Sequence, residues 1–336
     1  MVSRTSLVTG AGGFIGSHLT ERLLTLGGKV RALVSYRGDG SAGWLDSEEI
    51  NGHPNLEVVR GDIRDPHQMM ALVEGVDAVF NLAALIGIPY SFEAPMSYVS
   101  TNVVGTQNLL EAAKHHNVRA FIQTSTSEVY GTAQFVPMPE THPINPQSPY
   151  AASKVASDAL ATSYFHSFDM PVVVLRPFNT FGPRQSARAV IPTILTQLLD
   201  SESEGVRLGN LNARRDFTYV ADTVNGFVKS SDEIEKCAGR TLNLGAGWDI
   251  QVEELAELCA RVLGKSLTIV GDERRLRPNT SEVESLMSDN SLARETIGWD
   301  PVYSRPQGFE ELIEKTADWI RVKQAEGKYV NNGYRR

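Results

Sequence analysis

The stretch Gly10-Ala11-Gly12-Gly13-Phe14-Ile15-Gly16 decides the fold of this chain. It follows a β-branched run and opens an amphipathic stretch, so it lies at a strand-to-helix turn. Glycine at positions 10, 13 and 16 allows, in that order, a tight turn, a close approach of backbone to a pyrophosphate, and close packing of helix on strand. The helix N-terminus adds free N–H groups and a positive dipole end. We therefore predict a dinucleotide phosphate loop, rather than a merely flexible turn, with contacts from Gly10, Gly13, Phe14, Ile15 and Gly16.

Short strand-like runs alternate with helical stretches on both sides of this loop. Strands that alternate with helices form βαβ units. The sequence therefore predicts an α/β fold of the Rossmann type, with a doubly wound parallel sheet and right-handed crossovers. The expected strands are Ser6–Thr9, Lys29–Val34, Leu56–Arg60, Ala78–Leu82, Ala120–Thr124 and Val172–Arg176. The expected helices are Gly16–Leu26, Pro66–Val73, Val99–His115 and Pro149–Phe168.

The alternation weakens after about Pro177. We predict a dinucleotide-binding domain over residues 1–178 and a smaller α/β substrate-binding domain over 179–336, some elements of which join the first sheet. A ligand cleft between them would lie outside the carboxyl ends of the strands. The elements expected in the second part are a strand at Thr241–Leu244 and helices at Val190–Leu199, Tyr219–Ser230 and Val252–Leu263.

Composition restricts the class of protein. The chain has 336 residues, 41% hydrophobic and 21% charged, which is ordinary for a globular enzyme-sized protein. A net charge of −8 argues against a nucleic-acid partner, because phosphate neutralisation needs an excess of Lys and Arg. Cys237 and Cys259 have no metal spacing and indicate free thiols in a reducing compartment. With neither a signal peptide nor an apolar run of about 20 residues, we expect a soluble, cytoplasmic protein without a membrane partner.

The end of the second expected strand bears on the choice of cofactor. NAD-binding folds place an acid there to hold the ribose hydroxyls, but the stretch Leu33-Val34-Ser35-Tyr36-Arg37 has none, and Asp39 lies further on. Arg37 could meet a 2′-phosphate, stack on adenine or remain a solvated loop charge. We expect NAD, with NADP left open by this stretch. Asp62 is placed to accept from the adenine amino group or, equally, to cap a turn.

Tyr150 and Lys154 lie at i and i+4 near the start of an expected helix, so they share one face. A phenol with an ordinary pKa of ~10 is too weak a base at neutral pH. A nearby ammonium and a nicotinamide positive charge would lower that pKa. Tyr150 then becomes a base for a sugar or alcohol hydroxyl.

These motifs together resemble an extended short-chain dehydrogenase/reductase of the NAD-dependent epimerase/dehydratase family. The resemblance covers nearly the whole chain, through the phosphate loop, Asn81-Leu-Ala-Ala84, Asn102-Val-Val-Gly-Thr106, Ser125 to Gly131, Tyr150 with Lys154, Arg176-Pro-Phe-Asn179, Gly182-Pro-Arg184, Arg215-Asp-Phe and Arg277-Pro278. It implies a nucleotide-diphosphate sugar as substrate, no metal, and a homodimer that pairs the 99–115 and 149–168 helices.

The resemblance also implies contacts residue by residue. The cofactor would meet, besides the glycine loop, Arg37, Asp62, Ile63, Leu82, Ala83, Ala84, Thr124, Tyr150, Lys154 and Pro177. The substrate would meet Ile86, Tyr90, Ser91, Thr126, Asn179, Arg184, Val190, Arg215 and Arg277, with Arg215 and Arg277 as bidentate partners of the diphosphate. Arg274 and Arg275 are interpreted as solvated surface charges.

The segment Thr124-Ser125-Thr126-Ser127-Glu128-Val129-Tyr130-Gly131 bears on the reaction. By resemblance, Thr126 binds the sugar 4-hydroxyl, and a Glu before Val-Tyr-Gly is typical of dehydratases, where it removes the C5 proton. Ser127-Glu128 departs from the Asp-Glu pair of dTDP-glucose dehydratases. It is similar to GDP-mannose-type and legionaminic-acid-pathway 4,6-dehydratases, of which the latter act on nucleotide-activated N-acetylglucosamine. UDP-glucuronate decarboxylases share Thr-Ser-Glu.

The expected function is therefore a nucleotide-sugar 4,6-dehydratase, a lyase that forms a 4-keto-6-deoxy sugar. Tyr150 would take the 4-hydroxyl proton as C4 is oxidised, Glu128 would remove the C5 proton, and Glu128 or Ser127 would assist water loss from C6 before hydride returns there. Thr126 and Lys154 complete the expected catalytic group. The alternatives are a UDP-glucuronate decarboxylase or a 4-epimerase of the same fold. A non-catalytic dinucleotide sensor would be expected to lack Tyr150 or Lys154.

Overall fold

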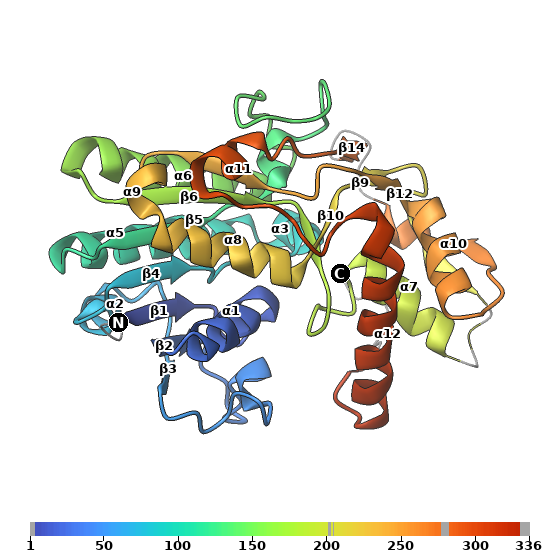
Figure 1. The fold of residues 1–336 in the computed structure, drawn as a ribbon, viewed down its shortest axis with the longest axis horizontal. Coiled ribbons are helices and arrows are strands. Elements are labelled where there is room, and N and C mark those ends of the chain that lie inside the picture. The colour runs from blue at the N-terminus through green and yellow to red at the C-terminus, as the bar shows by residue number, and fades with distance from the viewer. Residues whose placement is uncertain (1–3, 201–202, 204, 277–281, 330–336) are drawn as a thin grey trace.

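A computed structural model describes residues 4–200, 203, 205–276 and 282–329 of the chain. Its centre is a seven-stranded sheet in the order β11-β6-β5-β4-β1-β2-β3, with every neighbouring pair parallel (Figure 1). The predicted Rossmann-type α/β fold is confirmed. The strands are β1 (Thr5–Thr9), β2 (Lys29–Val34), β3 (Leu56–Arg60), β4 (Ala78–Asn81), β5 (Ala120–Thr124), β6 (Val172–Pro177) and β11 (Thr241–Leu244).

Helices cover both faces of this sheet, as Figure 1 shows. On one face α1 (Phe14–Thr25) packs beside α8 (Val220–Asp232), and on the other α5 (Gly105–His115) lies between α2 (Pro66–Val73) and α6 (Pro149–Phe168). Local sequence explains where two of them begin. Asp65 accepts from the N–H groups of His67 and Gln68 at the start of α2, and Ser148 accepts from that of Ala151 at the start of α6. Proline stands in the first turn of both helices.

The helix predicted over Val99–His115 differs at its start. Residues Val99–Val104 form a π-helical turn, η2, and only Gly105–His115 is α-helical. Two short helices, α3 (Ile88–Glu93) and α4 (Pro95–Tyr98), precede it. The wide turn contains Asn102, whose buried amide accepts from the Leu85 N–H and donates to the Leu85 carbonyl. Hydrophobic periodicity does not predict this turn, because the partner of Asn102 is the backbone of Leu85, which lies outside the helix.

The second half of the chain contributes to two bodies. Strand β11 and helix α8 join the large sheet, while α7 (Val190–Leu199), α10 (Val252–Val262) and α12 (Phe309–Ala325) gather beside it around a separate core (Figure 1). Smaller strand groups link these parts: β7 (Asn179–Phe181) with β10 (Phe217–Tyr219), β8 (Val206–Leu208) with β13 (Ile269–Gly271), and β9 (Arg214–Arg215) with β12 (Ile250–Gln251) and β14 (Ser285–Leu286). The remaining short helices are η1 (Gly43–Asp46), η3 (Ser127–Tyr130), α9 (Ile234–Cys237), η4 (Glu273–Arg275), α11 (Ser291–Ile297) and η6 (Pro306–Gly308).

Within the described ranges, no helix combines the length and the apolar character needed to cross a membrane.

Candidate active site

A cavity of about 810 Å³ lies between the carboxyl ends of the sheet strands and the second body. Its volume is in the range of small-molecule and cofactor sites. Segments from both halves of the chain line it, as the sequence predicts for a cleft at this edge. The predicted site residues that line it are Gly10, Gly13, Phe14, Ile15, Gly16, Arg37, Leu82, Ala83, Ala84, Ile86, Tyr90, Thr124, Thr126, Ser127, Glu128, Tyr150, Lys154, Pro177, Asn179, Val190 and Arg215.

The glycine loop forms one wall of the cavity and leaves no room for side chains. Gly10 has a φ of +67°, and a Cβ added there would lie 3.0 Å from the backbone of Ala83. A Cβ at Gly16 would lie 2.3 Å from the Gly10 carbonyl oxygen. Among the residues that the structure describes, no side chain caps helix α1, so its first N–H groups remain open to an anion. This cradle of bare backbone at a helix N-terminus fits a dinucleotide pyrophosphate.

Tyr150 and Lys154 face the cavity from the first two turns of α6. The Tyr150 phenol forms a hydrogen bond with the side chain of Thr126, while burial raises the Tyr150 pKa. Burial lowers the pKa of the Lys154 ammonium to about 8, against the opposing effect of Asp158, which lies one further turn along the helix. A charged Lys154 beside Tyr150 is the arrangement that favours the phenolate form of the tyrosine.

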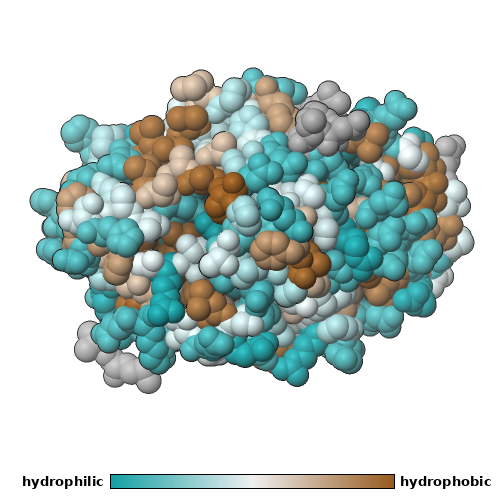
Figure 2. All heavy atoms as spheres, turned by 90° about the horizontal axis from the view of Figure 1, so that it is seen from above, coloured by the Kyte–Doolittle hydropathy of each residue, from teal (hydrophilic) through white to brown (hydrophobic). Residues whose placement is uncertain are grey.

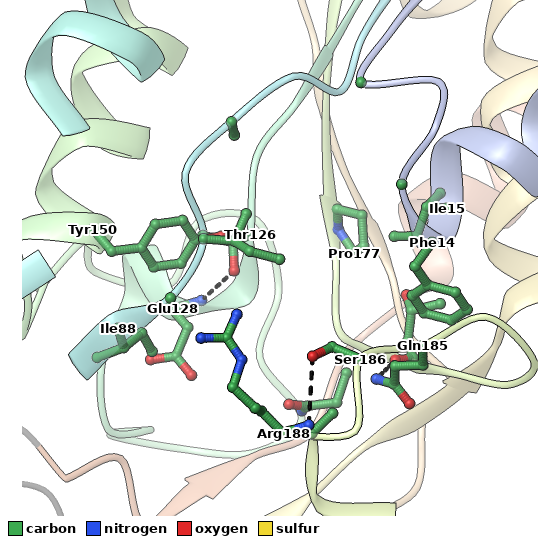
Figure 3. A pocket seen from close by; sticks show the side chains of 18 of the residues that line it. Phe14, Ile15, Ile88, Thr126, Glu128, Tyr150, Pro177, Gln185, Ser186 and Arg188 are labelled. Atoms are coloured by element: carbon green, nitrogen blue, oxygen red, sulfur yellow. Dashed lines mark hydrogen bonds between the residues drawn. The ribbon is translucent and has the colours of Figure 1, made fainter. Parts of the chain in front are cut away.

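Glu128 is the third ionisable group at this end of the cavity. It lies in the single turn η3, where its N–H donates to Thr126 Oγ1 at 3.3 Å. Figure 3 shows Glu128, Thr126 and Tyr150 side by side, with Pro177 and Phe14 across the pocket. Ser127 also lines the cavity, although only 3% of its surface is exposed. The Tyr150 phenol, the Thr126 hydroxyl and the Glu128 carboxylate therefore meet at this end of the cavity, so that a second potential base lies beside the first.

A buried polar network supports this group from below. Asp158 Oδ2 accepts from Ser125 Oγ at 2.5 Å and lies 3.5 Å from Arg176 Nη2. Arg176 donates to the Tyr130 hydroxyl at 2.9 Å, and that hydroxyl donates to Asn243 Oδ1 at 2.7 Å. Ser125 comes directly before Thr126, and Asn243 belongs to β11. The network thus ties the reactive segment to the sheet and to the second half of the chain.

Arginines reach the cavity from the second body. Arg215 is buried, and its guanidinium lies 3.6 Å from Glu282 and donates to the Arg214 carbonyl at 2.9 Å. Arg275 also lines the cavity, with only 15% of its side chain exposed, and it donates to Asp272 at 3.3 Å. Its interpretation as a solvated surface charge is therefore wrong, because the turn η4 points it inward, whereas Arg274 remains 65% exposed. Arg277 lies outside the described residues.

Four predicted contacts do not line the cavity. The Asp62 carboxylate accepts from the N–H and guanidinium of Arg64, so it caps a turn, the second of the two roles that its sequence position predicts. Arg184 extends to Glu21 on α1 at 2.8 Å. Ser91 is buried and donates to the Ile88 carbonyl at 2.7 Å. Ile63 is buried in a hydrophobic core cluster.

Several residues that line the cavity are not predicted from the sequence. Arg188 reaches from the loop before α7 toward Glu128 and Tyr150 (Figure 3). Ser35, Ser41 and Gln185 line the wall as well, and Glu282 faces the cavity beside Arg215. These residues lie in loops, where no periodicity predicts which way a side chain points. The sequence offers one indication for Arg188: it lies two residues before Val190, a predicted substrate contact at the start of an expected helix.

Comparisons with known proteins agree with this geometry. A family profile described as GDP-mannose 4,6 dehydratase matches residues 7–316. The chain is 34% identical to the UDP-glucose 4-epimerase of Mycolicibacterium smegmatis over 95% of this chain and 99% of the relative. It is 36% identical to a dTDP-glucose 4,6-dehydratase of an Actinoplanes species, over 95% and 98%. It resembles the crystal structure of the dTDP-glucose 4,6-dehydratase DesIV from Streptomyces venezuelae with NAD and TYD bound, with a TM-score of 0.84, 29% identity and coverage of 96% and 98%.

Proposed function

The chain belongs to the GDP-mannose 4,6-dehydratase family, and on that premise we propose that it is a nucleotide-sugar 4,6-dehydratase. Its substrate is a hexose or N-acetylhexosamine carried on a nucleoside diphosphate, and its product is the 4-keto-6-deoxy sugar. One observation carries the proposal: Glu128 lies in the cavity beside Thr126 and Tyr150. An epimerase needs no carboxylate at this position as a second base, because rotation of a 4-keto sugar requires no removal of the C5 proton.

The cofactor is NAD, the dinucleotide carried by the related DesIV structure. The glycine cradle and the open N-terminus of α1 fit its pyrophosphate, and Leu82, Ala83 and Pro177 line the wall toward Tyr150. When bound, the nicotinamide supplies the reversible two-electron oxidation at C4 and returns the electrons at C6. We assign residues 1–178 to dinucleotide binding and 179–336 to nucleotide-sugar binding, apart from the elements that complete the large sheet.

The residues of this chain supply the proton transfers. Tyr150, hydrogen-bonded to Thr126 and one helical turn from Lys154, takes the proton of the 4-hydroxyl. Burial raises the pKa of the phenol in this structure, and the charges of Lys154 and of a bound nicotinamide would act in the opposite direction. The 4-ketone acidifies the C5 proton, which the Glu128 carboxylate removes. The protonated Glu128 then donates to the departing 6-hydroxyl, so that water leaves and Glu128 regains its charge. As the electrons return at C6, C5 takes up one proton, which balances the proton that Tyr150 took from the 4-hydroxyl. Each positioned acid or base of this kind contributes about 10²–10⁴ in rate.

The nucleotide and diphosphate lie toward the second body in this proposal. Arg215 offers a planar guanidinium that is already held in place by Glu282 and a backbone carbonyl, which suits bidentate recognition of a phosphate. Val190 lines the cavity and opens α7, which no side chain of the described residues caps, so the first N–H groups of this helix are available to an anion there. Asn179 lines the wall between the two groups.

We also propose a homodimer that pairs η2–α5 and α6 with the same helices of a second copy. Val99 is 41% and Val104 47% exposed along the first of these helices, and Phe168 is 52% exposed at the end of the second. A second copy packed on these helices would remove these apolar side chains from water. Figure 2 shows hydrophobic residues exposed in several patches of the face seen from above. Light scattering of the wild type and of Val104→Asp tests this assembly, and two monomeric proteins would contradict it.

The decisive experiment incubates the protein with UDP-, GDP-, CDP- and dTDP-linked glucose, mannose and N-acetylglucosamine. Loss of one water from one of these sugars is the expected result, with Tyr150→Phe as the inactive control. Two alternatives give other masses. An unchanged mass with a new epimer would identify a 4-epimerase, the activity named for the Mycolicibacterium smegmatis relative. Loss of carbon dioxide from UDP-glucuronate would identify a decarboxylase.

A further inference from the structure

Tyr98 lies behind the wall of the cavity, against the ring of Tyr150. It ends the short helix α4 and is only 1% exposed, and it is not among the described residues that line the cavity. Its ring centroid lies 6.3 Å from that of Tyr150, and the two ring planes are inclined by 75°. This edge-to-face arrangement is one that aromatic rings favour. The two rings and Ile88 form a small hydrophobic cluster, and Figure 3 shows Ile88 and Tyr150 at the same end of the pocket.

The Tyr98 hydroxyl holds the segment of chain that leads from β4 into α3. It donates to the Gly87 carbonyl oxygen at 2.5 Å, and the same oxygen accepts from the Ser91 N–H in α3 at 3.1 Å. Gly87 lies within residues 86–90, all of which line the cavity. Burial raises the pKa of Tyr98 above its ordinary value, so the hydroxyl keeps, at neutral pH, the proton that this hydrogen bond requires.

Tyr98 therefore contacts two parts of the site through two different chemical groups. The hydrogen bond between Tyr150 and Thr126 fixes the outer end of the Tyr150 phenol, whereas the Tyr98 ring packs against the body of the Tyr150 ring. The Tyr98 hydroxyl fixes the cavity wall over residues 86–90. A shift of that wall would move a bound sugar relative to the phenol, and a misplacement of about 1 Å can lower a rate by about 100-fold.

We propose that Tyr98 is a positioning residue, which holds the ring of Tyr150 and the cavity wall at residues 86–90 in one fixed relation. The inference rests on the proposed function, because it takes Tyr150 as the base at the 4-hydroxyl and residues 86–90 as neighbours of the sugar. The ring of Tyr98 acts on the rate of the chemical step, and its hydroxyl acts on the binding of the sugar. The two roles can be separated, because phenylalanine removes the hydroxyl and keeps the ring.

The first test is steady-state kinetics of Tyr98→Phe and Tyr98→Leu, with the member of the UDP-, GDP-, CDP- and dTDP-linked set that wild-type protein dehydrates. Tyr98→Phe should raise KM by about threefold to tenfold, the range of one hydrogen bond, and leave kcat within about twofold of wild type. Tyr98→Leu should raise KM similarly and also lower kcat by about tenfold to hundredfold, because the Tyr150 ring loses its aromatic neighbour. A tyrosine that served only stability would give no such division between KM and kcat.

The second test is hydrogen exchange followed by mass spectrometry, which needs neither sugar nor turnover. In Tyr98→Phe, the backbone amides of residues 86–91 should exchange about threefold to tenfold faster than in wild type. Loss of the hydrogen bond to the Gly87 carbonyl lowers the free energy of local opening of this segment. This measurement reports on the hydroxyl contact in the full-length protein directly.

Tyr164→Phe is the matched control. Tyr164 lies on the same helix as Tyr150, is 4% exposed and is not among the described residues that line the cavity. Its hydroxyl also forms hydrogen bonds, with Gln107 at 2.6 Å and with Glu111. The control variant loses a comparable hydroxyl but should leave kcat, KM and the exchange of residues 86–91 unchanged.

Two results would overturn the proposal. One is wild-type exchange of residues 86–91 in Tyr98→Phe, and the other is a folded Tyr98→Leu variant whose kcat stays within about twofold of wild type. A wild-type protein that dehydrates none of the sugars would instead refute the proposed function, and the exchange measurement would still decide whether the Tyr98 hydroxyl holds this wall. The two failures are therefore distinguishable.

Discussion

Replacing Lys154 by methionine should stabilise the protein while it removes activity. Burial lowers the pKa of this ammonium from its ordinary 10.5 to about 8, and each pKa unit corresponds to about 1.4 kcal/mol. The folded state therefore carries a penalty of about 3 kcal/mol whenever Lys154 is charged. Methionine has a similar length and no charge to desolvate. Part of the gain is lost again, because Asp158 loses one of the two cationic neighbours that the described residues give it and keeps Arg176.

The sign of this effect depends on pH. Below about pH 8, Lys154 is charged in both the folded and the unfolded state, so the penalty is fully present. Between pH 8 and 10.5 the folded protein releases the proton while the unfolded chain keeps it, so the penalty disappears as pH rises. The variant should thus gain most near pH 7 and nothing above about pH 10.5. For 336 residues with an unfolding entropy of about 2 cal/mol/K each, 3 kcal/mol corresponds to a Tm increase of about 4 °C.

Thermal unfolding of wild type and Lys154→Met at several pH values measures this difference directly. Lys29→Met, at an exposed position at the start of β2, is the matched control and should show no such pH trend. A Lys154→Met protein that is less stable than wild type at pH 7 would refute the reasoning, as would a difference that does not shrink between pH 8 and 10.5. Activity should fall steeply in the same variant, because Tyr150 loses the cation that favours its phenolate.

Three further changes test other parts of the site. Glu128→Gln should slow water loss by a factor of about 10²–10⁴ but spare oxidation at C4. The Glu128 charge raises the pKa of Tyr150, so its removal makes that phenol easier to ionise. The absorbance of reduced nicotinamide should therefore accumulate, and product formation near the wild-type rate would contradict the role of Glu128. Gly16→Ala places a Cβ 2.3 Å from the Gly10 carbonyl oxygen and should weaken NAD binding at least about tenfold, measured by calorimetry. Gly27→Ala is the comparison for thermal stability alone: its added Cβ meets nothing within 4 Å, but the φ of Gly27 is positive and strains the backbone. Asp158→Asn breaks the buried pair with Arg176 and should lower the free energy of unfolding, measured in urea, by about 3 kcal/mol. It should also move the alkaline limb of the pH–activity profile to lower pH, since Asp158 supports the charged form of Lys154. An unmoved limb would show that Asp158 does not act on Lys154.

Much of the fold follows from local sequence. The predicted bounds of Lys29–Val34, Leu56–Arg60, Ala120–Thr124 and Pro149–Phe168 agree with the structure to the residue. These segments are short β-branched runs or a long helix with Ser148 and Pro149 at its start, and both patterns depend on neighbours only a few residues away. The glycine loop is predictable for the same reason, because its function is carried by the backbone and its spacing is local.

The directions of the loop arginines could not be predicted from the sequence. Arg184 and Arg188 lie four residues apart, yet the first extends to Glu21 on α1 and the second enters the cavity. The φ of Arg184 is +69°, a left-handed conformation that redirects the chain and that no hydrophobic pattern encodes. Arg275 shows the reverse case, since a charge that looked solvated is held inward by Asp272. In each case the partner that decides the direction comes from tertiary packing.

The position of β11 has a consequence for how this protein must be made. Its residues lie more than 60 positions after β6 in the chain, yet β11 pairs with β6 in parallel register and its Asn243 accepts from Tyr130 beneath the site. A nascent chain that has emerged only as far as residue 178 therefore has every other strand of the sheet but an open edge at β6. Unpaired edges of this kind template pairing with other chains, so the half-made protein depends on its later residues, or on a chaperone, until synthesis reaches β11.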